Sequence, residues 1–199
     1  MAAVRRLGDG VNRTYDDHVP TTRDALLDAA TDLLDEGGPA AVTLREVGHR
    51  AGVSHNAPYK HFADKNALLA AVAARELTHQ TWAARHTDLR PALSAYVTWA
   101  LAHPARFKLV FGTWNTGSAD LGAAADTASA AFLRVVKAGQ EAGDLPAGDP
   151  VRLAALVRSV AHGAVDLALS GHLAADGKGG ADPQDLVDDL LGHLRAAAR

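Results

Sequence analysis

The sequence predicts an all-α protein, in which an N-terminal three-helix domain containing a helix-turn-helix precedes a larger helical domain. Two observations support this class. Residues 43–65 form two short helix patterns joined by the turn Ala51-Gly52-Val53-Ser54, and the rest of the chain repeats apolar residues at helical spacing without a convincing strand pattern. We therefore expect a tail at 1–20, a helix-turn-helix domain at 21–66 and a helical domain at 67–199.

The composition limits the classes of protein to consider. A chain of 199 residues with 48% hydrophobic content can bury one or two modest cores, and it has no long uncharged apolar run that would span a membrane. The absence of cysteine removes disulfides, thiol catalysis and cysteine-ligated zinc. The first twenty residues mix Arg and Asp without an apolar centre, which indicates a loose tail rather than a signal peptide. We expect a soluble, cytoplasmic protein.

The first helix is expected to follow Thr22 and to run to the breaker Gly37-Gly38-Pro39. Its apolar stripe comprises Leu26, Leu27, Ala30, Leu33 and Leu34. This spacing predicts a scaffold helix ahead of the helix-turn-helix.

The helix-turn-helix begins with a predicted capping box, because Thr43 is followed three residues later by Glu46. The first of its helices then covers about 44–51. Gly52 can adopt the left-handed backbone that ends a helix, and Ser54 is positioned to cap the next helix. One tight turn therefore separates the two helices.

The second helix of the motif is polar on its outward side. Val53 and Phe62 are predicted to join the small core of the first helix, whereas the outward residues are His55, Asn56, Tyr59, Lys60 and His61. Amide, imidazole, phenol and ammonium groups suit the base edges and phosphates of a nucleic acid. A polar helix that is simply solvated is the alternative that the motif alone leaves open.

Residues 22 to about 75 resemble the DNA-binding domain of the TetR family of bacterial transcriptional regulators. The resemblance rests on Ala51-Gly52-Val53-Ser54, Tyr59-Lys60-His61-Phe62, Lys65 and Leu68-Leu69. Two residues depart from the family pattern: Pro58 stands where Leu or Ile is usual, and Gly48 stands where Ala is common. We expect Pro58, at the fourth position of its helix, to remove only the first intrahelical bond while altering the pitch of the helix.

The resemblance implies that some residues of the motif read bases and others hold phosphates. His55, Asn56 and Tyr59 would face the major groove, although simple exposure is the alternative for His55. The complete predicted DNA-contacting set is Thr43, Arg45, His55, Asn56, Tyr59, Lys60, His61 and Lys65, of which Thr43, Tyr59, His61 and Lys65 are the implied phosphate contacts.

The net charge of −3 is unusual for a DNA-binding protein, but the sign reverses locally. Within the motif the basic residues outweigh Glu46 and Asp64; they are Arg45, Arg50, Lys60 and Lys65. We therefore expect modest, salt-sensitive affinity, which a dimer would strengthen by doubling the phosphate contacts.

Beyond the motif, the chain is predicted to be helical. The expected segments are a connecting helix at about 64–84, helices opening at Pro91 and Pro104, a helix at about 120–141 that ends at Gly143, and helices starting at Asp149-Pro150 and Asp182-Pro183. The glycine-rich stretch 176–180 is predicted to be a loop, because it lacks the Lys and Ser/Thr ending of a phosphate-binding P-loop.

The last two helices carry apolar stripes that suit self-association. The predicted interface residues are Leu156, Val160, Leu167, Leu186, Leu190 and Leu194. The family resemblance implies that these helices pack against their copies in a four-helix interface, while packing within one chain is the alternative. A homodimer would place two recognition helices about one DNA turn apart, which suits a palindromic operator.

The C-terminal part resembles a TetR subgroup with a Trp-His-Gly type ligand domain. The matching residues are His103-Pro104, Phe107 to Gly112, Ala138-Gly139-Gln140 through Asp149-Pro150, and His162-Gly163. Arg158 stands where the tryptophan of that subgroup is expected. The resemblance implies a pocket for a small-molecule effector of unknown identity.

Aromatic residues crowd into one short region of this domain, together with a few polar groups. The predicted ligand-binding residues are Tyr96, Trp99, His103, Phe107, Phe111, Trp114, His162 and Asp166. Large apolar walls with polar handles suit a small-molecule pocket, whereas plain core packing is the alternative. No cofactor and no metal are expected.

Together these features predict a repressor-type switch, in which a ligand alters the angle or separation of two DNA-reading heads through the connecting helix at 65–84. Activation of a promoter instead of repression is the alternative that the sequence leaves open. An enzyme is the rival class, but the chain has no His-Glu-x-x-His pair, no Gly-x-Ser-x-Gly elbow and no credible set of spaced carboxylates. A helical module that no longer binds DNA is a third interpretation, which Pro58 keeps open.

Overall fold

The computed structural model describes residues 21–79, 86–114 and 117–199, and these stretches contain nine α-helices and no strand beyond an isolated bridge between Ala174 and Gly179. The helices are α1 (Thr22–Ala41), α2 (Leu44–Arg50), α3 (Ala57–His61), α4 (Lys65–His79), α6 (Leu89–Ala102), α7 (Pro104–Val110), α8 (Ala119–Glu141), α9 (Pro150–Leu169) and α10 (Pro183–Ala197). The all-α expectation is confirmed. The predicted tail at 1–20 and the end of the predicted connecting helix, 80–84, lie outside the described residues.

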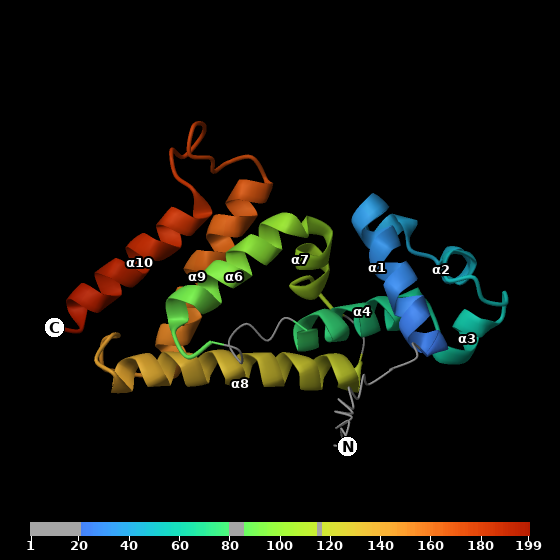
Figure 1. The fold of residues 1–199 in the computed structure, drawn as a ribbon, viewed down its shortest axis with the longest axis horizontal. Coiled ribbons are helices and arrows are strands. Elements are labelled where there is room, and N and C mark those ends of the chain that lie inside the picture. The colour runs from blue at the N-terminus through green and yellow to red at the C-terminus, as the bar shows by residue number, and fades with distance from the viewer. Residues whose placement is uncertain (1–20, 80–85, 115–116) are drawn as a thin grey trace, which may run out of the picture.

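The molecule is elongated, with α1, α2 and α3 forming a head at one end and α10 lying at the other (Figure 1). Helix α4 runs from the head toward the middle, where it packs against α1, α7 and α8 (Figure 1). Every residue of α4 from Leu68 to Ala74 is buried. The head is therefore joined to the C-terminal helices through a helix that is covered on several sides.

The N-terminal cap of α1 is Thr21 rather than Thr22, which corrects the expected start. The side-chain oxygen of Thr21 accepts a hydrogen bond from the backbone N–H of Asp24 (3.2 Å), and the carboxylate of Asp24 accepts one from the backbone N–H of Thr21 (3.1 Å). A capping box needs an acceptor three residues after the cap, and Asp24 has that spacing only with Thr21.

Helix α1 also extends past its predicted end. The backbone leaves the helical region at Gly37 and Gly38, where φ of Gly38 is 67°, and then resumes a short helical turn that ends at Ala41. Pro39 opens this turn, where its missing N–H is not needed. The Gly-Gly-Pro breaker thus interrupts the helix as predicted, but a further turn follows it.

The first half of the helix-turn-helix has the predicted N-cap residue and the predicted glycine at its end, but the capping box is only half formed, because the Glu46 carboxylate lies near His49 (3.9 Å) instead of bonding back to Thr43. Thr43 accepts a hydrogen bond from the backbone N–H of Glu46 (3.1 Å), and Gly52 has a φ of 66°. The N–H of Gly52 bonds to the carbonyl of His49 and that of Val53 to the carbonyl of Gly48, both at 3.1 Å. These two bonds form a Schellman motif, which ends α2 sharply.

The second half differs from the prediction, because Ser54 does not cap the following helix. Helix α3 begins at Ala57 after Asn56, and the N–H of Ala57 bonds to the carbonyl of Ser54 in a turn (2.9 Å). A helix starting at Ser54 would need the N–H that Pro58 lacks. Starting at Ala57 instead puts Pro58 in the first turn, where no donor is required.

The C-terminal helices largely start where the caps predict. Helix α7 starts at Pro104, whereas α9 and α10 start at Pro150 and Pro183 after the caps Asp149 and Asp182. Helix α6 begins two residues before the expected Pro91, because Asp88 accepts a hydrogen bond from the N–H of Arg90 (3.0 Å). Among the described helices, none combines the length and the apolar character needed to cross a bilayer.

Candidate nucleic-acid interface and ligand cluster

The eight residues predicted to contact DNA lie on α2, on α3, in the adjoining turns and at the start of α4, and we call them the recognition surface. Seven of them are exposed and Lys65 is half-buried; the exposed ones are Thr43, Arg45, His55, Asn56, Tyr59, Lys60 and His61. Tyr59 leaves 52% of its surface in solvent despite its aromatic ring. No part of the described chain covers this surface, so it is open to a partner.

A small apolar core supports the exposed polar residues of α3. Phe62, Val47 and Pro58 are buried beneath them, and α3 packs against both α1 and α2. Because α3 begins at Ala57, His55 and Asn56 lie in the turn before the helix rather than on it. The His55 ring still meets the Tyr59 ring edge-on, with the centroids 6.0 Å apart, so the turn and the helix present one surface.

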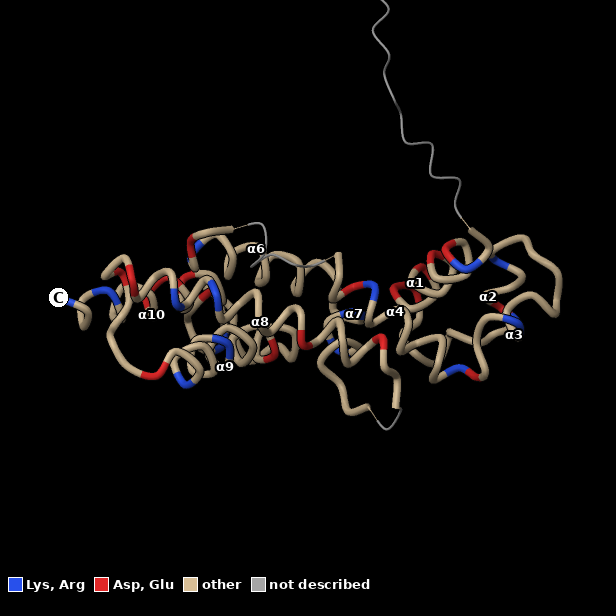
Figure 2. The backbone as a smooth tube through the Cα atoms, turned by 90° about the horizontal axis from the view of Figure 1, so that it is seen from below, with Lys and Arg blue, Asp and Glu red and all other residues tan. Residues whose placement is uncertain are grey.

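The positive charge of the recognition surface is smaller than the sequence count suggests. Arg50 forms a two-pronged ion pair with Glu36 on α1, with nitrogen–oxygen distances of 2.7 and 2.8 Å. This hydrogen bonding lowers the pKa of Glu36 and raises the pKa of Arg50. Arg50 therefore braces α2 against α1, and the cations left for phosphates are Arg45, Lys60 and Lys65. Figure 2 shows Lys and Arg positions on the head mixed with Asp and Glu positions.

Lys65 is fixed at the start of α4. The carboxylate of the preceding Asp64 accepts a hydrogen bond from the backbone N–H of Ala67 (2.8 Å), which caps the helix. Lys65 is thus the first residue of a capped helix, a position that suits contact with one phosphate.

Four of the predicted ligand-binding residues meet in the C-terminal part: Tyr96 on α6, Phe107 on α7, Phe111 at its end and His162 on α9. We call them the aromatic cluster. The hydroxyl of Tyr96 lies 2.9 Å from Nδ1 of His162. The His162 ring centroid lies 4.7 Å from that of Phe107 and 5.0 Å from that of Phe111. A polar contact thus joins Tyr96 and His162, which lie 66 positions apart in the sequence, beside the rings of Phe107 and Phe111.

The electrostatics of the cluster favour a neutral histidine. Burial is the main cause that lowers the pKa of His162; Asp166 opposes this shift and Arg158 adds to it. Burial also raises the pKa of Tyr96, so its phenol keeps the proton. We assign the Tyr96 hydroxyl as the donor and Nδ1 of His162 as the acceptor, because the neutral imidazole has one nitrogen free to accept.

The other predicted ligand-binding residues do not join this cluster. Trp99 and His103 contact each other on another face of α6, with ring centroids 6.3 Å apart. They border an open groove of about 590 Å³ that also includes His86 and Pro91. Trp114 packs against the main core, and Asp166 is exposed on α9. The single predicted pocket is therefore divided over two faces of α6.

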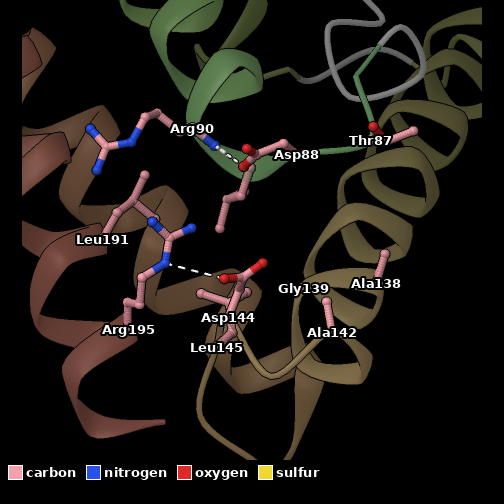
Figure 3. Close-up of a pocket in the computed structure, with 11 residues that line it drawn as sticks. Thr87, Asp88, Arg90, Ala138, Gly139, Ala142, Asp144, Leu145, Leu191 and Arg195 are labelled. Atoms are coloured by element: carbon pink, nitrogen blue, oxygen red, sulfur yellow. Dashed lines mark hydrogen bonds and ion pairs between the residues drawn. The ribbon is translucent and has the colours of Figure 1, made fainter. Parts of the chain in front are cut away.

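A further small pocket lies where α6 begins, α8 ends and α10 passes (Figure 3). Its volume is about 130 Å³, below the 300–1,000 Å³ usual for drug-sized ligands. Its arginines are already paired: Arg195 Nε lies 3.2 Å from Asp144 Oδ1, and Arg90 forms an ion pair with Asp188. We therefore do not assign the effector to this pocket, which no sequence pattern had indicated.

Helix α7 connects the aromatic cluster to the head. Arg106, beside Phe107, hydrogen-bonds through Nε to both carboxylate oxygens of Asp35 on α1 (3.0 and 3.1 Å) and through Nη2 to one of them (2.5 Å). Its Nη1 lies 3.5 Å from the carboxylate of Glu76, which is buried in α4 with 4% exposure. The hydrogen bonds with Asp35 are the main cause that raises the pKa of Arg106. The same short helix thus contacts both the aromatic cluster and the head.

Sequence reasoning missed this link, because the partners lie 71 and 30 positions apart and each charge also looks like an ordinary solvated residue. No short-range pattern could have found it. As for metal ions, within residues 21–79, 86–114 and 117–199 no group of three or more His, Cys, Asp or Glu side chains is placed to hold one.

The state of His162 gives a prediction for stability against pH. Its folded-state pKa is lowered below the usual value near 6.5, so below about pH 6.5 the unfolded chain binds a proton that the folded chain resists. The contribution of His162 to the stability of the folded protein is therefore largest above that pH. In thermal unfolding followed by circular dichroism, the melting temperature of the parental protein should fall toward that of His162→Gln between pH 7.5 and 5.5. A gap that widens toward acid would contradict a neutral His162.

Two family models match the chain. The model described as "Bacterial regulatory proteins, tetR family" matches residues 26–72, and the model "Tetracyclin repressor-like, C-terminal domain" matches residues 89–194, more than half of the chain. An HTH-type transcriptional repressor of Mycobacterium tuberculosis is 43% identical over 58 residues, which cover 27% of this chain and 31% of that protein. The match to the curated relatives thus spans about a third of their length.

Solved structures share the fold over most of the chain. A protein of unknown function from Rhodococcus sp. RHA1 superimposes with a TM-score of 0.75 at 29% identity, covering 92% of this chain and 97% of that one. The "putative transcriptional regulator SCO4942 from Streptomyces coelicolor" gives a TM-score of 0.61 at 27% identity, covering 88% of this chain and 97% of that one. With a recognition surface in the head and a family model over each domain, the chain belongs to the TetR family of bacterial transcriptional regulators.

Proposed function

We propose that this regulator is a ligand-responsive repressor that binds a palindromic operator as a homodimer. Residues 21–66 bind DNA, and residues 67–199 bind the effector and dimerise. The observation that carries the proposal is the recognition surface, whose polar side chains stand exposed over the buried Phe62 and Pro58. A regulator of this kind acts where the bacterial chromosome lies, so we propose a cytoplasmic location.

His55, Asn56 and Tyr59 are the proposed base readers, because they are exposed together in the turn before α3 and on α3. Thr43, Arg45, Lys60, His61 and Lys65 are the proposed phosphate contacts around them. Tyr59 combines a hydroxyl with a ring that packs on His55, so it can also reach a phosphate.

Two substitutions separate base reading from phosphate binding. Asn56→Ala should weaken operator binding by about 10- to 100-fold and relax the sequence preference, whereas Lys60→Ala should weaken binding to all duplexes and reduce the salt slope by about 1. Fluorescence anisotropy over a series of salt concentrations measures both. Lys137→Ala, an exposed lysine on α8, is the matched control and should change neither quantity.

A gel-shift assay tests the alternative of a helical module that does not bind DNA. A gel shift with the region upstream of the gene should show a sequence-selective complex that added salt weakens. If no duplex from that region is preferred over unrelated DNA at any salt concentration, the regulator acts through another partner and the proposed operator is wrong.

The proposed dimer interface lies on α9 and α10. On α9, Leu156 and Leu167 leave 50% and 47% of their surface exposed, which is costly for large apolar side chains in a single copy. Val160 on the same helix is half-buried, as are Leu186, Leu190 and Leu194 on α10. A second copy packed against these helices would cover this surface and double the number of heads.

Introducing charges tests this interface without disturbing the core. The double variant Leu156→Glu/Leu167→Glu should be monomeric by light scattering and should lose at least about tenfold in operator affinity, because each head then binds alone. Leu101→Glu, on the exposed side of α6, is the matched control and should remain dimeric. A dimer of unchanged strength in the double variant would place the interface elsewhere.

We further propose that the effector binds beside the aromatic cluster. Phe107 and Phe111 offer apolar walls, and the Tyr96–His162 pair offers a polar handle, so a largely apolar molecule with one hydrogen-bonding group would fit this chemistry. The His162-Gly163 pair supports membership of the Trp-His-Gly type subgroup, with Arg158 in place of its tryptophan.

The signal would then pass through α7 as well as α4. An effector that displaces Phe107 or Phe111 would move α7. Arg106 of this helix hydrogen-bonds to Asp35 in the head, so the movement would reach the head. A different ion pair, Arg75 with Asp28 at 2.6 Å, joins α4 to α1 and offers the route through the connecting helix.

The variants Asp35→Asn and Asp28→Asn distinguish the two routes. With an effector identified by screening for operator release, Asp35→Asn should keep operator affinity within about threefold and should lose most of an allosteric coupling of about 5- to 150-fold. Asp28→Asn should retain more of it. The opposite ranking, measured by anisotropy with and without effector, would assign transmission to α4 alone.

A further inference from the structure

The two residues that depart from the family pattern are in contact with each other. Gly48 lies in α2 and Pro58 in α3, and both are buried. A methyl group added to Gly48 would place its carbon 2.8 Å from Cγ and 3.4 Å from Cδ of Pro58. Packed carbon atoms normally lie about 3.5–4.0 Å apart. Gly48 therefore leaves room for the proline ring.

Backbone conformation does not explain this glycine. The glycines with positive φ in the described chain include Gly38 and Gly52, but not Gly48, which has the backbone of an ordinary helical residue. Glycine weakens a helix interior relative to alanine, so α2 would gain from a side chain here. The space that the Pro58 ring occupies is the physical reason against one.

This contact lies at the joint between the two helices of the motif. The carbonyl of Gly48 accepts the N–H of Val53 in the turn (3.1 Å), and the carbonyl of Pro58 accepts the N–H of Phe62 at the end of α3 (2.9 Å). Tyr59, the next residue after Pro58, is on the recognition surface. Any change in the spacing between Gly48 and Pro58 must therefore move α3 and its base-reading side chains relative to α2.

We infer that Gly48 and Pro58 form a matched steric pair that fixes the position of α3 against α2. This position then determines which half-site sequence the protein prefers. The inference rests on the proposed DNA-reading role of α3. Neither residue touches DNA; both act as positioning residues for His55, Asn56 and Tyr59. The Pro58 ring fits against position 48 only when the residue there has no β-carbon. An alanine at position 48 would require a different residue at position 58.

A double-mutant cycle tests the pair with the full-length protein. The variants are Gly48→Ala, Pro58→Ala and the two combined, and the probe is a duplex library randomised over both half-sites, from which the parental protein first selects its preferred site. Gly48→Ala alone should weaken binding to that site by about tenfold or more and select different bases in the half-site, because the ring must shift. In the Pro58→Ala background, the same change should alter affinity by less than about threefold.

Two further readouts separate positioning from simple loss of structure. The salt slopes of the four proteins should differ by less than about 1, the change expected for one lost phosphate contact, because the substitutions remove no charged side chain. Thermal unfolding should show that Gly48→Ala remains folded at the assay temperature. Gly122→Ala is the matched control: it adds a methyl group to a helical glycine of α8 with no atom within 4 Å, and should leave both affinity and base preference unchanged.

Three outcomes would overturn the inference. If Gly48→Ala selects the parental half-site with parental affinity, the contact does not position α3. If Gly48→Ala lowers operator affinity equally in the parental protein and in the Pro58→Ala variant, the Pro58 ring is not the cause of the loss. If the parental protein selects no sequence at all, the proposed function fails together with this inference, whereas selective parental binding without coupling between the two positions overturns the inference alone.

Discussion

The burial of α4 is the constraint on which the rest of the structure depends. From Leu68 to Ala74 every residue of this helix is buried, and α4 packs against α1 in the head as well as against α7 and α8. A helix so enclosed cannot shift alone, because any movement opens gaps on several sides and loses packing energy. The head and the C-terminal helices are therefore coupled through this packing, and a ligand of the C-terminal domain would act on the head only by favouring one packing arrangement over another.

Polar contacts at the edges of α4 link α7 both to α4 and to the head. Arg106 reaches the buried Glu76 and the head residue Asp35 from one short helix, whose next residue, Phe107, belongs to the aromatic cluster. Arg50 and Glu36 hold α2 on α1 within the head. The head is thus stiff within itself and connected at defined points to the domain that would bind an effector. That arrangement suits a switch whose DNA-reading surface moves as a unit.

Local signals in the sequence were sufficient for much of the fold. Thr43, Gly52 and the Asp-Pro starts of α9 and α10 act within one helical turn, so their roles follow from neighbouring residues. The predictions for Thr22 and Ser54 were wrong, because a competing cap at Thr21 and the missing N–H of Pro58 moved the starts of α1 and α3. The link from Arg106 to Asp35 and the division of the predicted ligand-binding residues over two faces of α6 depend on tertiary packing, which helical spacing cannot specify.

The central claim is that the recognition surface enters a DNA groove and is presented twice by a symmetric pair of chains. Hydroxyl-radical footprinting of the region upstream of the gene tests it most directly. The account predicts two equivalent protected patches on one face of the duplex, with centres about one helical turn or a whole multiple of it apart, and both lost together when Tyr59 is replaced by alanine and assayed at the protein concentration that just saturates the parental footprint. A single asymmetric patch, or protection that survives the loss of Tyr59, would contradict it.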